Sequence, residues 1–174
     1  MDIEPDIKDW TWVLERRCPD CGFDASAIDV GGVPDLLVEV ADKFAELLTT
    51  GAAVGVRPAP GTWSPLEYGC HVRDCTMVFD ERLELMLTLD DPPFPNWDQD
   101  AAAVEGRYGE QDPVAVAGEI RSAAAGLAER FASVEGAQWD RTGRRSNGSF
   151  FTVETLARYF IHDPVHHWWD VGGV

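Results

Sequence analysis

The chain has few basic residues. It contains 14 lysines and arginines against 31 acidic residues, so its formal net charge at pH 7 is −17. A charge of this sign and size repels nucleic acid and anionic lipid surfaces. We therefore expect neither nucleic acid nor a membrane as a partner, and a small-molecule substrate is the expected ligand.

Long apolar runs are also missing. No window approaches the roughly 18 consecutive apolar residues that a membrane-spanning helix needs, and residues 1–10 lack the basic flank and apolar stretch of a secretory signal. The cytoplasm is the expected compartment. In that compartment the four cysteines are expected as thiols or metal ligands rather than as structural disulfides.

Four segments have the apolar periodicity of an amphipathic helix. They cover residues 33–51, 63–91, 112–136 and 152–173. The second begins with a capping box at Ser64 and Glu67. The last contains Pro164, which removes a backbone hydrogen bond and is expected to bend the helix.

The remaining segments look like loops. No alternating strand pattern persists in residues 91–111 or 137–151, although a short helix is expected near residues 100–105. Four amphipathic helices of this length favour an all-α four-helix bundle. We expect residues 33–174 to form that bundle and residues 1–32 to form an N-terminal extension that packs on it.

The histidines are few and unevenly placed. Of four, three lie at positions 162, 166 and 167, and the other is His71. His162 and His166 share a helix face because they are four residues apart, the spacing of zinc-binding helices. His71 lies on the predicted buried face of the second helix. Together these three predict a metal site with one open position; a pair of histidines near a helix end, where the dipole favours cations, is the alternative.

Helix direction decides whether these histidines can meet. His71 is near the start of its helix, whereas His162 and His166 are near the end of theirs. An up-down-up-down bundle would separate them by roughly 30 Å, at about 1.5 Å per residue. An up-down-down-up bundle brings them together, and it needs a long crossover between the second and third helices. The segment 91–111 has the right place for that crossover.

Two stretches resemble a known family. "WSPLEYGCHVRD" and "FIHDPVHHWWDV" are similar to the metal-binding segments of DinB/YfiT-like metalloenzymes. The resemblance implies a four-helix bundle with a divalent metal on His71, His162 and His166. Zinc is the expected metal, with nickel or iron as alternatives, and a low-molecular-weight thiol is implied as a co-substrate because several relatives are thiol S-transferases.

The expected function is therefore that of a metal-dependent thiol S-transferase or hydrolase. An open position on the metal can hold a thiol or water and lower its pKa. His167 and Asp163 are the candidates for the catalytic base. His167 is rotated about 100° from His166, so it joins the same cluster only if Pro164 distorts the helix. A non-catalytic binding or stress protein that the metal stabilises is the alternative.

Other residues near the histidines leave alternatives open. The sequence "CPDCGFD", with Cys18 and Cys21, is similar to half of a zinc knuckle, but Cys70 and Cys75 are badly spaced to complete it. A tight turn on the bundle is the expected role, with a second metal site or a redox pair as alternatives. Tyr68, Asp74 and Asp170 each lie near a histidine and could orient an imidazole, and Asp170 could also be a fourth ligand. A homodimer is left open.

Overall fold

A computed structural model describes residues 9–173 of the chain. The first eight residues of the predicted extension and the last residue lie outside this range. The helices are α1 (Val33–Thr50), α2 (Pro65–Thr88), α3 (Gln99–Glu105), α4 (Pro113–Ala132) and α5 (Val153–Asp170). The strands are β1 (Pro93–Phe94), β2 (Thr142–Arg145) and β3 (Phe150–Thr152).

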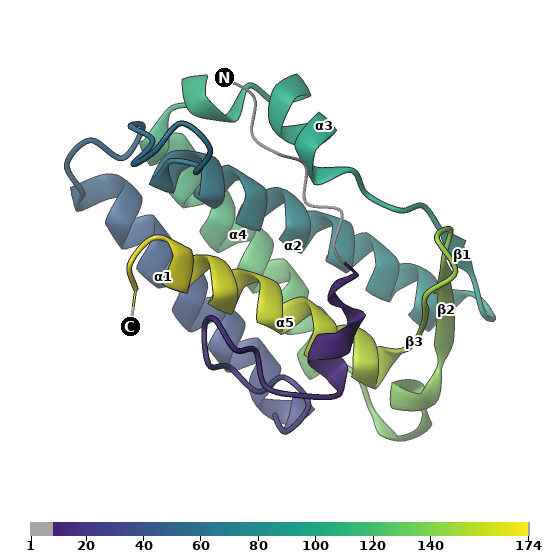
Figure 1. Cartoon of the computed structure of the whole chain (residues 1–174). Coiled ribbons are helices and arrows are strands. Elements are labelled where there is room, and N and C mark those ends of the chain that lie inside the picture. Colours follow the sequence, from purple (N-terminus) through teal and green to yellow (C-terminus); the bar gives the residue numbers. More distant parts are fainter. Residues whose placement is uncertain (1–8, 174) are drawn as a thin grey trace.

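The four long helices form an up-down-down-up bundle, which confirms the predicted topology. In Figure 1, α1 and α5 run in one direction, whereas α2 and α4 run in the other. The crossover between α2 and α4 contains β1, α3 and a short 3₁₀ helix, Tyr108–Glu110. Because α2 and α5 are antiparallel, the start of α2 lies beside the end of α5.

A small sheet joins the crossover to the start of α5. β1 pairs in parallel with β2, and β2 pairs antiparallel with β3. The prediction that residues 91–111 and 137–151 are only loops was therefore wrong in part. Strands of two to four residues are too short to show an alternating pattern.

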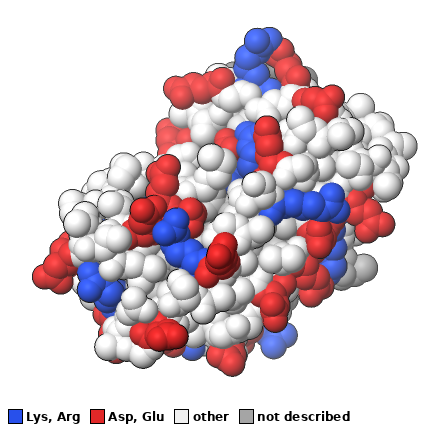
Figure 2. All heavy atoms as spheres, turned by 180° about the vertical axis from the view of Figure 1, so that it is seen from behind, with Lys and Arg blue, Asp and Glu red and all other residues white. Residues whose placement is uncertain are grey.

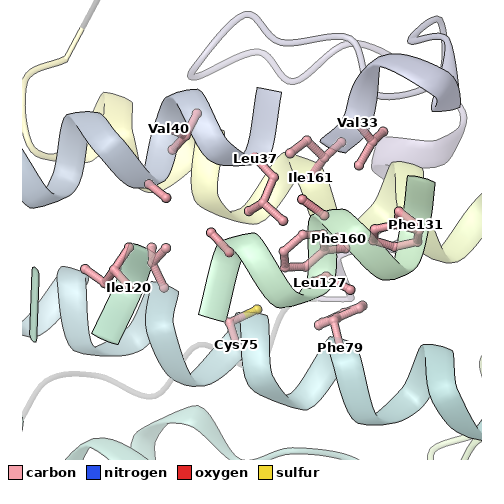
Figure 3. Close-up of a cluster of buried hydrophobic side chains, with 14 of the residues drawn as sticks. Val33, Leu37, Val40, Cys75, Phe79, Ile120, Leu127, Phe131, Phe160 and Ile161 are labelled. Carbon is pink, nitrogen blue, oxygen red and sulfur yellow. The ribbon is translucent and has the colours of Figure 1, made fainter. Parts of the chain in front are cut away.

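The predicted apolar stripes form the core. Figure 3 shows Leu37, Phe79, Leu127 and Phe160, one from each long helix, directed into the space between the helices. Fully burying a side chain of this size contributes about 1.5–3 kcal/mol of transfer free energy. Within residues 9–173, no helix combines the length and apolar character that crossing a membrane requires.

Several basic side chains on the surface pair with acidic ones. On the face in Figure 2, basic side chains stand apart from one another, with acidic side chains near them. Arg121 lies 2.7 Å from Asp42, and Arg130 lies 2.6 Å from Asp80. Exposed pairs of this kind contribute about 0–1 kcal/mol each, so burial rather than ion pairing holds the bundle together.

The start of α2 is fixed by the predicted capping box. The Glu67 amide donates to Ser64 Oγ at 3.2 Å, and the Ser64 amide donates to Glu67 Oε2 at 2.8 Å. Arg57 Nε also donates to Glu67 Oε2 at 2.8 Å. Burial raises the pKa of Glu67, but the hydrogen bonds from Arg57 and Ser64 outweigh burial and leave that pKa lowered.

We predict that Glu67→Gln lowers the free energy of unfolding at pH 7 by about 1–2 kcal/mol. This is the lower part of the range for hydrogen bonds to charged groups, because the Arg57 side chain is 36% exposed. A lowered carboxyl pKa stabilises the fold above the unfolded-state pKa of about 4.3 and loses this effect as pH falls through the folded-state value. Urea denaturation at pH 7 and near pH ~3 should therefore show a smaller difference between the two proteins in acid.

The matched control is Glu110→Gln, which removes an exposed carboxylate from its pair with Arg107. It should change stability by less than about 0.5 kcal/mol at both pH values. Equal effects of the two substitutions would contradict the role given to Glu67.

Candidate metal sites

The last turns of α5 present possible metal ligands on two neighbouring faces. His162 and His166 lie on one face, and Asp163 and His167 lie on the next, about 100° further round the helix. The helix continues through Pro164, and that residue is buried within it. A single helix therefore supplies two separate groups of side chains.

The first group is the cysteine–histidine cluster, which we define as Cys18, Cys21, His162 and His166. Cys18 Sγ lies 3.6 Å from His166 Nδ1, and Cys21 Sγ lies 3.8 Å from His162 Nε2. One possible ligand atom from each residue lies within 4.8 Å of all the others. Both cysteines are free thiols.

A tight turn carries the two cysteines to α5. The Gly22 amide donates to the Cys18 carbonyl at 3.0 Å, and the Cys18 amide donates to the Phe23 carbonyl at 2.9 Å. Gly22 has φ = +73°, a left-handed conformation that glycine adopts without steric penalty. Before the turn, the Trp10 ring lies against this cluster, with its centroid 5.3 Å from that of His166.

The second group is the histidine–aspartate cluster, which we define as His71, Cys75, Asp163 and His167. His71 Nε2 lies 3.4 Å from Asp163 Oδ2 and 3.3 Å from Asp163 Oδ1. His167 Nε2 lies 3.7 Å from Asp163 Oδ2. The rings of His71 and His167 meet edge to face, with centroids 4.7 Å apart.

Aromatic rings from other segments enclose His71, whose exposed fraction is 0%. Trp97 comes from the crossover and stacks on the imidazole at 5.3 Å between centroids and 23° between planes. Trp63, just before α2, lies 5.3 Å from the same ring. The crossover thus covers the buried side of the histidine–aspartate cluster.

Asp170 contacts both clusters. His167 Nδ1 lies 2.7 Å from Asp170 Oδ2, and His166 Nε2 lies 3.9 Å from Asp170 Oδ1. A carboxylate on Nδ1 of His167 favours the tautomer with its proton on that nitrogen, which leaves Nε2 unprotonated and facing Asp163. The other two candidates to orient a histidine differ: Asp74 accepts a hydrogen bond from Tyr108, whereas the Tyr68 ring packs against His167.

Burial and neighbouring charge give the two clusters different protonation. Burial raises the pKa of Asp163, but electrostatic interaction with His71 and His167 and hydrogen bonds from His71 and Cys75 outweigh burial, so the pKa is lowered and the carboxylate stays ionised. Burial, followed by repulsion from His166, lowers the pKa of His162 to about 4. Burial also raises the pKa of Cys21 to about 11. At neutral pH, His162 is neutral, as a metal ligand must be.

Both clusters border one cavity of about 830 Å³. Asp163, His167 and both histidines of the cysteine–histidine cluster line it, whereas His71 lies behind its wall. Six carboxylates and two guanidinium groups are among the lining side chains: Asp9, Asp20, Asp98, Asp100, Asp163, Asp170, Arg82 and Arg145. A volume of this size is typical of a small-molecule site.

The structure divides the ligand set that the sequence predicted. His162 and His166 lie with the two cysteines, and His71 lies with Asp163 and His167, which the sequence suggested as catalytic bases. No group of close ligand atoms among residues 9–173 unites His71 with His162 and His166. The physical reason is the one-residue offset on α5, because His71 faces the side of the helix that carries positions 163 and 167.

The comparisons with known proteins establish the family. The model of the DinB superfamily matches residues 36–171, and the chain belongs to this family. A comparison with curated proteins found no match.

A solved structure has the same fold. It is YfiT from Bacillus subtilis, described as a probable metal-dependent hydrolase with an unusual four-helix bundle topology. The two are 18% identical, with a TM-score of 0.63, and the alignment covers 99% of this chain and 95% of that chain.

We predict that Trp97→Ala opens His71 to solvent. In the native protein, diethyl pyrocarbonate should leave His71 unmodified, because Trp97 and Trp63 enclose the ring. In the variant, peptide mapping by mass spectrometry should find His71 modified. Trp139→Ala is the matched control, since Trp139 is a half-buried tryptophan of the 3₁₀ helix Gly136–Asp140. Equal labelling of His71 in the native protein and the Trp97 variant would contradict the enclosure.

Proposed function

We propose that the chain is a metal-dependent hydrolase whose divalent metal is bound by His71, Asp163 and His167. Two imidazoles and one carboxylate form a common ligand set for catalytic zinc, and nickel and iron also accept these ligands. The description of YfiT as a probable metal-dependent hydrolase supports the same class of reaction. The observation that carries the proposal is a buried imidazole–carboxylate cluster beside a large cavity.

Unpaired polar atoms support this choice of ligands. Four buried side-chain nitrogen and oxygen atoms in residues 9–173 have no hydrogen bond, and Asp163 Oδ1 and His71 Nδ1 are two of them. A buried polar atom without a partner costs about 1–3 kcal/mol. A cation beside Asp163 would supply the missing interaction for its carboxylate.

The surrounding side chains hold the ligands in position. Asp170 fixes the tautomer of His167 through Nδ1. The Cys75 thiol donates to Asp163, and burial raises the pKa of that thiol, so it remains a donor rather than a thiolate. Cys75 therefore supports the Asp163 carboxylate, which also lies 3.3 Å from His71 Nε2 and 3.7 Å from His167 Nε2.

When bound there, the metal would supply Lewis-acid chemistry and would lower the pKa of a water far enough to make it a nucleophile near neutral pH. Tyr68 lines the same cavity, and burial raises its pKa to about 12. Its phenol therefore stays protonated and can donate a hydrogen bond to a substrate. The six carboxylates on the lining favour a neutral or cationic substrate over an anionic one.

The test is metal content and hydrolysis in matched variants. Zinc-loaded protein should hydrolyse members of a panel of neutral and cationic esters, amides and lactones. His71→Ala and Asp163→Asn should each lose this activity together with one metal ion per chain. Cys70→Ala should keep both, because Cys70 precedes His71 on α2 but its thiol faces the Tyr108 carbonyl.

Other outcomes separate the alternatives. Activity and metal content that survive in both cluster variants would contradict the site. Turnover that occurs only with an added low-molecular-weight thiol and an electrophile, with an S-conjugate as product, would replace the hydrolase with a thiol S-transferase. A metal that raises the melting temperature while neither reaction occurs would replace it with a non-catalytic metal-stabilised protein.

A further inference from the structure

We propose that the cysteine–histidine cluster binds a second metal ion, of the zinc class, with Cys18, Cys21, His162 and His166 as its four ligands. The site shares no ligand with the histidine–aspartate cluster. It also differs in kind, because four protein ligands leave no position open for water or substrate. We infer a structural role for it.

Two sulfur–nitrogen distances within the cluster are close to those of a tetrahedral zinc site. Zinc lies about 2.3 Å from sulfur and about 2.0 Å from nitrogen, so a sulfur and a nitrogen on the same tetrahedral ion are about 3.5 Å apart. The two sulfur–nitrogen pairs are 3.6 and 3.8 Å apart, Cys18 with His166 and Cys21 with His162. The remaining pairs of ligand atoms lie within 4.8 Å of one another, so all four are close enough to contract around a common centre.

The ligand chemistry favours zinc over magnesium or calcium. Thiolate sulfur and imidazole nitrogen prefer zinc and its soft neighbours, whereas magnesium and calcium prefer oxygen ligands. On binding, each cysteine would release its S–H proton to solvent, and no electron would be transferred. In the turn, the backbone N–H of Phe23 hydrogen-bonds the Cys21 sulfur.

A neighbouring carboxylate orients His166, as is common for histidines that bind metals. His166 directs Nδ1 toward Cys18, while its other nitrogen, Nε2, faces Asp170 at 3.9 Å. A carboxylate near the second nitrogen of a ligating histidine fixes the orientation of the ring. Because Asp170 also contacts His167, one side chain would position a ligand in each site.

The site would fasten the N-terminal segment to the far end of the chain. Cys18 and His166 are 148 residues apart in sequence. A cross-link that closes a long loop removes the most conformational entropy from the unfolded chain, and so has the largest calculated effect on stability. The segment from residue 9 to residue 32 includes Asp9, Trp10 and Asp20, which line the cavity. A metal on this cluster would therefore hold one wall of the proposed active site.

The experiment uses the full chain loaded with cobalt(II) or zinc under reducing conditions. Cobalt(II) should give thiolate-to-metal charge-transfer absorption, and zinc X-ray absorption should show sulfur neighbours at about 2.3 Å. Cys18→Ser and Cys21→Ser should each remove the charge-transfer band and one metal ion per chain. Cys70→Ala is the matched control, since its buried thiol lies outside both clusters, and it should keep the band.

The outcomes distinguish this site from the proposed active site. His71→Ala should keep the thiolate band while it loses the other ion, whereas Cys18→Ser should lose the band and keep that ion. A reduced, metal-loaded native protein without sulfur ligation would overturn the second site, whether or not the variants fold. A Cys18–Cys21 disulfide in protein purified with its metal would also overturn it and would favour a redox pair.

Discussion

The site depends on the antiparallel packing of α2 against α5. His71 lies in the second turn of α2, and the residues that it meets lie near the end of α5, so only opposite helix directions bring them together. The capping box at Ser64 and Glu67 fixes where α2 begins and therefore the position of His71. The long crossover that this topology requires then returns Trp97 to cover the imidazole.

The one-residue offset on α5 has the largest chemical consequence. His162 and His166 face the N-terminal segment, whereas Asp163 and His167 face α2, because successive residues are rotated about 100° on a helix. One helix can thus support a closed cluster with sulfur ligands and an open cluster with oxygen and nitrogen ligands. The first suits a structural metal, and the second suits a catalytic one. Asp170 contacts His166 in the first cluster and His167 in the second, so one side chain connects the two clusters.

The sequence predicted the bundle well because its signals are local. The capping box, the apolar stripes and the length of segment 91–111 together indicated the helices and their direction, and the DinB superfamily match confirms the family. The small sheet could not be predicted, because β1 and β2 pair across 51 residues (144 minus 93) and are very short.

The division of the ligand residues was harder to predict from sequence. The spacing of His162 and His166 indicated a pair but did not show which neighbouring segment the pair faces. The sequence contains the four ligand types, Cys18, Cys21, His162 and His166. It does not show that they meet, because the two pairs are 141 or more residues apart and come together only through tertiary folding. Asp163 and His167 have the same four-residue spacing, and their carboxylate–imidazole composition made them look like bases rather than ligands.

The most direct test of the account is an anomalous difference map from zinc-grown crystals, with data collected on both sides of the zinc absorption edge. The account predicts two separate peaks for each chain. One should lie among His71, Asp163 and His167, and the other among Cys18, Cys21, His162 and His166. A single peak bounded by His71, His162 and His166, with the cysteines turned away, would contradict it.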